Sequence, residues 1–63
     1  MNYVMLSQFD KKLYQVHVRI LRASDNEHVL TVMAYLKANP IGLSDALRVA
    51  TAGEARRRKL RLV

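Results

Sequence analysis

Apolar and polar side chains alternate strictly between Leu13 and Leu21. In an extended chain, one side would carry Tyr14, Val16, Val18 and Ile20, and the other side Gln15, His17 and Arg19. Because successive side chains of a strand point to opposite faces, the pattern predicts a short strand with one apolar and one polar face. The β-branched and aromatic residues of this segment favour the same interpretation.

A helical pattern competes with the strand over the same residues. Apolar side chains recur at three- and four-residue steps through Leu6, Phe9, Leu13, Val16 and Ile20. Ser7 and Asp10 could form a capping box, which would make residues 7–22 one amphipathic helix. That helix would leave Tyr14, Val18 and Leu21 outside its main apolar stripe, so we prefer the strand.

Two helices are predicted after this segment. Ser24 and Glu27 have the spacing of a capping box, and the apolar positions that follow share one helical face. Pro40 ends this first helix, because the residue before a proline avoids the helical conformation. The second helix is expected to begin near Ser44, while residues 54–63 fit either a helix or a strand.

The chain has 63 residues, a size that predicts a single small domain with residues 1–12 as a possible arm. It contains no cysteine and only two histidines without ligand-like spacing, so we expect no metal site and no cofactor. A core this small favours a homodimer. The absence of a long apolar run or a signal peptide predicts a cytoplasmic protein without a membrane segment.

Positive charge is concentrated at the end of the sequence. Eleven Lys and Arg residues against five Asp and Glu residues give a formal net charge of +6. The segment 54–63 holds Arg56, Arg57, Arg58, Lys59 and Arg61. Such a cluster attracts phosphate groups or acidic surfaces, so these residues are candidate contacts with the backbone of a nucleic acid.

Other polar residues suggest how a nucleic acid could be recognised. Glutamine pairs well with adenine and arginine with guanine in the major groove, which makes Gln15 and Arg19 candidate base-reading residues, with His17 between them. Ser44 stands at a predicted helix start, where free backbone N–H groups bind phosphate. The chain shows no cysteine nucleophile, glycine-rich phosphate loop or carboxylate pair typical of an enzyme, and its two histidines have no obvious serine partner.

The order of these elements resembles that of the Arc-type ribbon-helix-helix repressors. The similarity covers the predicted strand Tyr14–Ile20, the helix Ser24–Ala38, and Gly42-Leu43-Ser44 leading into Asp45–Ala52. It implies an α+β fold in which two chains pair their strands as an intertwined homodimer. It also implies that Gln15, His17 and Arg19 read double-stranded DNA and that Ser44 contacts its backbone. The function expected from this resemblance is sequence-specific DNA binding by a transcriptional regulator.

Two other architectures fit the same sequence. An all-helical fold would be similar to helix-turn-helix or winged-helix proteins, and the basic residues 56–61 would then approach DNA. The segment from Ile41 to Leu47 also looks like the helix entry in the C-terminal domain of ribosomal stalk proteins, which binds other proteins. The alternative function is therefore an inhibitor or adaptor whose basic end engages an acidic or nucleic-acid-binding partner.

Overall fold

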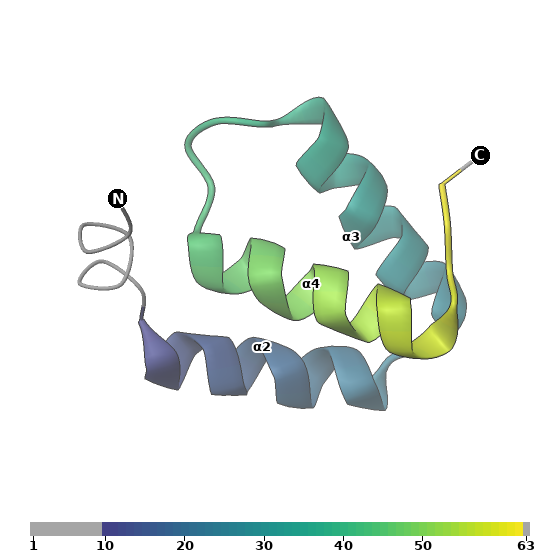
Figure 1. Cartoon of the computed structure of the whole chain (residues 1–63), viewed down its shortest axis with the longest axis horizontal. Coiled ribbons are helices and arrows are strands. Elements are labelled where there is room, and N and C mark those ends of the chain that lie inside the picture. The colour runs from purple at the N-terminus through teal and green to yellow at the C-terminus, as the bar shows by residue number, and fades with distance from the viewer. Residues whose placement is uncertain (1–9, 63) are drawn as a thin grey trace.

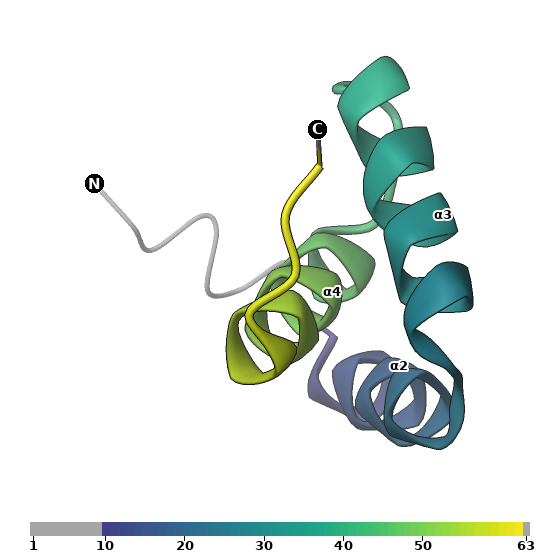
Figure 2. The same ribbon diagram turned by 90° about the vertical axis from the view of Figure 1, so that its right-hand side faces the viewer.

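The computed structural model describes residues 10–62 of the chain. These residues form three helices: α2 (Lys11–Ala23), α3 (Asn26–Ala38) and α4 (Asp45–Arg58). Helices α2 and α4 lie side by side and run in the same direction, whereas α3 crosses them steeply (Figures 1 and 2). The ends of α2 and α4 that carry free carbonyl groups therefore lie at the same end of the molecule.

The predicted strand is wrong, because residues 13–22 belong to helix α2. Between residues 10 and 62 the structure has no strand, so the α+β class and the intermolecular ribbon are wrong as well, and the all-helical alternative is confirmed as the fold class. Tyr14, Val18 and Leu21 follow helical spacing and pack toward the core, with Leu21 only 2% exposed. Ile20, placed on the apolar strand face by the alternation, is 52% exposed.

Helix α2 carries two apolar stripes, which explains why period 2 and period 3.6 both fit its sequence. The first stripe (Tyr14, Val18, Leu21) forms part of the core, and the second (Leu13, Val16, Ile20) lies at the surface. The helix begins at Lys11, so the last two residues of the possible arm, 11 and 12, form its first turn. The side chain of Asp10 caps it by accepting a hydrogen bond of 3.0 Å from the backbone N–H of Leu13. Residues 1–9, which include the proposed cap Ser7 and the stripe positions Leu6 and Phe9, lie outside the described residues.

The two later helices agree with the sequence except for one cap. Asp25, not Ser24, caps α3, because its carboxylate accepts a hydrogen bond of 2.8 Å from the N–H of His28. Helix α3 ends at Ala38, two residues before Pro40. Ser44 caps α4 as predicted and accepts hydrogen bonds from the N–H groups of Ala46 and Leu47.

The core lies where α4 meets both other helices. Its fully enclosed centre consists of Leu21, Val29 and Ala50, one residue from each helix. Ala46 and Ala50 are buried on α4, and their small side chains let α2 approach closely. After α4, the chain reverses at Lys59, so that Leu60 packs against the core instead of continuing a helix or forming a strand.

Within the described range, no helix is both long and apolar enough to cross a membrane.

Candidate nucleic-acid interface

The parallel arrangement of α2 and α4 gathers positive charge at one end of the molecule. Arg22 lies in the last turn of α2, and Arg56, Arg57 and Arg58 lie in the last turn of α4, followed by Lys59. Each helix C-terminus carries about half a negative charge, so the two ends together offset about one cation. Glu54 offsets another, which leaves this end of the described structure with a surplus of about three positive charges.

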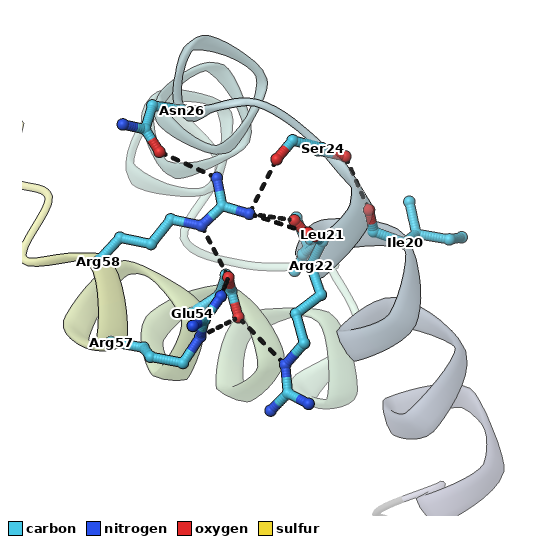
Figure 3. A network of polar contacts seen from close by, with 8 residues as sticks. All are labelled: Ile20, Leu21, Arg22, Ser24, Asn26, Glu54, Arg57 and Arg58. Carbon is cyan, nitrogen blue, oxygen red and sulfur yellow. Dashed lines mark hydrogen bonds and ion pairs between the residues drawn. The ribbon is translucent and has the colours of Figure 1, made fainter.

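Arg58 connects the ends of all three helices, and its side chain is only 13% exposed (Figure 3). Its Nη2 group donates hydrogen bonds of 2.8 Å to the carbonyl oxygens of Leu21 and Ser24. Its Nη1 group donates to Oδ1 of Asn26 at 3.0 Å, and its Nε group to Oε2 of Glu54 at 2.7 Å. Arg58, a candidate DNA contact from the sequence, therefore points into the protein and links the ends of the three helices.

Glu54 is the second member of this network and is 4% exposed. Arg57 donates to both of its carboxylate oxygens, at 3.2 Å from Nε and 2.6 Å from Nη2. Nε of Arg22 lies 3.8 Å from Oε1 (Figure 3). The hydrogen bond from Arg57, aided by Arg58 and opposed by burial, lowers the pKa of Glu54 to about 2. In return, Glu54 raises the pKa of Arg57.

Glu54 was missed at the level of sequence, although its spacing contained a signal. It precedes Arg57 by three positions and Arg58 by four, and side chains at these separations face each other on a helix. The arginine run is therefore not a uniform solvated segment. One arginine is enclosed, a second is paired at the surface, and Arg56 lies on a different side of α4.

The three residues of the predicted polar strand face do not all lie on one side of helix α2. Gln15 and Arg19 are four residues apart and share one exposed side of α2, to which Arg22 also belongs. His17 lies about 200° around the helix from Gln15, because each residue turns the helix by about 100°. It is half-buried and does not share the surface of the other two. The third polar residue on the side of Gln15 and Arg19 is therefore Arg22, whereas the strand interpretation expected His17.

Two shallow depressions lie on this side of α2, and the second of them reaches α4. The first has a volume of about 300 Å³ and is lined by Tyr14, Gln15, Val18, Arg19 and Arg22. The second, of about 210 Å³, shares Tyr14, Val18 and Arg22 with it and reaches Gly53 and Arg57 on α4. We call the surface formed by Gln15, Arg19, Arg22 and Arg57 the basic face.

The remaining candidate residues lie elsewhere. Ser44 caps the start of α4, at the opposite end of that helix from Arg57, and its Oγ atom is engaged by two backbone N–H groups. Arg56 and Lys59 line a separate depression beside Met33 of α3. The predicted DNA-binding set therefore contributes only Gln15, Arg19 and Arg57 to one continuous surface.

No protein-family model, curated protein or solved structure matches this chain.

Proposed function

We propose that this protein binds double-stranded DNA through the basic face and acts as a transcriptional regulator. The observation that carries the proposal is the pair Gln15 and Arg19, four residues apart on an exposed side of α2, with Arg22 and Arg57 beside it. The proposal includes the cytoplasmic location expected from the sequence, since the protein must reach DNA.

The dimensions and chemistry of α2 suit the major groove. A helix of 13 residues is about 20 Å long, and the major groove is wide enough to admit a helix. Lys11–Ala23 contains no acidic residue that would be repelled by phosphate. Gln15 can pair with adenine and Arg19 with guanine, because both side chains can form two hydrogen bonds to those base edges.

Arg22, at the end of the inserted helix, and Arg57, beside it on α4, would contact the phosphate backbone. The side chain of Arg57 is 55% exposed even though it pairs with Glu54, so part of its guanidinium faces solvent. Contacts of this kind position a protein on the duplex and make its affinity depend on salt. Arg58 has no such role in the proposal, since its guanidinium is occupied within the fold.

The oligomeric state stays a prediction. The homodimer was expected from the small core and from a paired ribbon; α2 occupies the residues that would have formed the ribbon, so only the argument from core size remains. Sedimentation equilibrium of the full chain measures this directly. A monomer would read a single short site, whereas a dimer would favour two half-sites with two-fold symmetry.

Fluorescence anisotropy with a labelled 20-base-pair duplex of random sequence tests the proposal. We expect binding at 50 mM salt that weakens steeply as salt increases, with Arg57→Ala reducing the salt slope by about 1. Lys37→Ala removes the same charge from the end of α3, away from the basic face, and should leave the slope unchanged. Circular dichroism of each variant establishes that it is folded.

Sequence preference is tested separately by selecting duplexes from a random pool. Arg19→Ala should relax the preference at one position, with a loss of about 1–3 kcal/mol of discrimination there. Absence of duplex binding at 50 mM salt would overturn the proposal and favour the protein-interaction function. If Arg57→Ala and Lys37→Ala change the salt slope by the same amount, the basic face is not the surface that binds DNA.

A further inference from the structure

We propose that the depression between α3 and the end of α4 binds a small amphiphilic anion, such as a carboxylate with an aliphatic chain. This site lies on another side of α4 from the basic face and does not depend on DNA binding. It has a volume of about 610 Å³, which is within the usual range for ligand sites.

The lining of this depression divides into an apolar floor and a cationic rim. Met33, Ala52, Ala55 and Leu60 form the floor, and Arg56, Lys59 and Arg61 form the rim. A neighbouring depression of about 320 Å³ shares Met33 and Ala52, extends the apolar surface toward Leu36 and Leu62, and has Lys37 and Arg48 in its lining as well. Apolar surface bordered by cations matches a ligand that has an anionic head and an apolar body.

The rim cations differ from the other arginines of this segment in having no partner among the residues that the structure describes. Arg57 and Arg58 both form ion pairs with Glu54. Within residues 10–62, the side chains of Arg56, Lys59 and Arg61 make no hydrogen bond or ion pair. Their charges are therefore available to an anion, and among residues 10–62 no acidic side chain lines the depression to compete for them.

The backbone of Lys59 provides an independent observation. Its φ angle is 59°, a left-handed conformation that strains residues with a Cβ atom and that glycine adopts freely. The N–H of Leu60 donates to the carbonyl of Ala55 at 2.9 Å, which identifies the helix end at which glycine is the usual residue. The stability of the fold alone would favour glycine at position 59. We therefore assign the side chain of Lys59 to contact with the ligand.

Nuclear magnetic resonance of the full chain, labelled with carbon-13 at the methionine methyl groups, tests the site with octanoate as the probe. We expect a saturable shift of the Met33 methyl signal at millimolar octanoate. The uncharged analogue 1-octanol, with the same chain length, should bind at least tenfold more weakly. An unmoved Met33 signal, or equal affinity for the two compounds, would overturn the proposal.

Variants of the rim and floor separate ligand contact from folding. Lys59→Gly should weaken octanoate binding at least threefold without lowering Tm, and Arg56→Ala should weaken it similarly. Ala52→Glu should weaken binding more than Ala52→Gln, since the two side chains match in size and differ in charge. Lys12→Ala, which removes an exposed cation from α2, should have no effect. Wild-type affinity in Lys59→Gly would contradict the assignment of its side chain.

Discussion

The Nη2 group of Arg58 donates a hydrogen bond of 2.8 Å to the carbonyl oxygen of Leu21, 37 positions earlier in the chain. The last carbonyl groups of a helix have no partner within that helix. Two parallel helices bring two such sets of carbonyls together, along with two negative helix ends. Arg58 satisfies carbonyls at the end of α2 from its position at the end of α4, and so joins the two helices where they would otherwise repel.

Removing the Arg58 guanidinium should therefore destabilise the fold. Arg58→Met keeps much of the aliphatic stem and leaves Glu54 and the α2 carbonyls with fewer donors. We expect the free energy of unfolding to fall by about 2–4 kcal/mol, the range for losing a hydrogen-bonded, enclosed charge. Urea unfolding followed by circular dichroism measures the change. The control is Arg56→Met, at an exposed position of the same helix turn, whose free energy of unfolding should stay within about 0.5 kcal/mol of wild type. Equal losses of stability in the two variants would refute this role of Arg58.

Stability should depend on pH through Glu54. The pKa of this carboxyl is about 2 in the folded protein, below its ordinary value of 4.5. The folded state therefore binds the proton more weakly than the unfolded state, and the contribution to stability is complete above pH 4.5 and lost as the pH falls toward 2. Urea unfolding at several pH values should show that Glu54→Gln is less stable than wild type at pH 7 and loses less stability on acidification. Glu27→Gln, which alters an exposed carboxylate, serves as the control. If Glu54→Gln loses as much stability on acidification as wild type, groups other than Glu54 cause the pH dependence.

Leu21 and Ile20 provide a direct test of helix against strand in the first segment. In α2, Leu21 is enclosed and Ile20 is at the surface, whereas the strand interpretation places Ile20 on the apolar face. Leu21→Ala should lower the free energy of unfolding by about 2–5 kcal/mol, the range for emptying a core site. Ile20→Ala should change it by about 0.5 kcal/mol or less. Both are measured by urea unfolding, and the reverse order of the two losses would restore the strand.

Lys59→Gly should stabilise the fold. Relief of the left-handed backbone should increase the free energy of unfolding by about 1 kcal/mol, reduced somewhat by the greater flexibility of glycine in the unfolded chain. Lys59→Ala keeps the Cβ atom and should give no such gain, so thermal unfolding of the two variants separates backbone strain from loss of the lysine charge. A gain of the same size in Lys59→Ala would attribute the effect to charge.

Local signals in the sequence were sufficient for α3 and for the start of α4. Pro40 ends one helix and Ser44 caps the next, because both act through the backbone of their immediate neighbours. The cap of α3 was predicted one residue too early, since Ser24 and Asp25 are both good capping residues. Among the candidate site residues, Gln15 and Arg19 remained together because a spacing of four residues keeps two side chains on one side of either a strand or a helix.

The first segment and the arginine run depended on tertiary contacts. The residues from Leu13 to Leu21 fit two periods, and packing against Val29 of α3 and Ala50 of α4 selects the helix that buries Leu21. The sequence by itself determined a basic end next to capped helices. Only the tertiary structure decided which cations remain available for binding. The parallel ends of α2 and α4 leave carbonyl groups without a partner in their own helix, and Arg58 binds them from within the fold. Arg56, two residues earlier, stays at the surface.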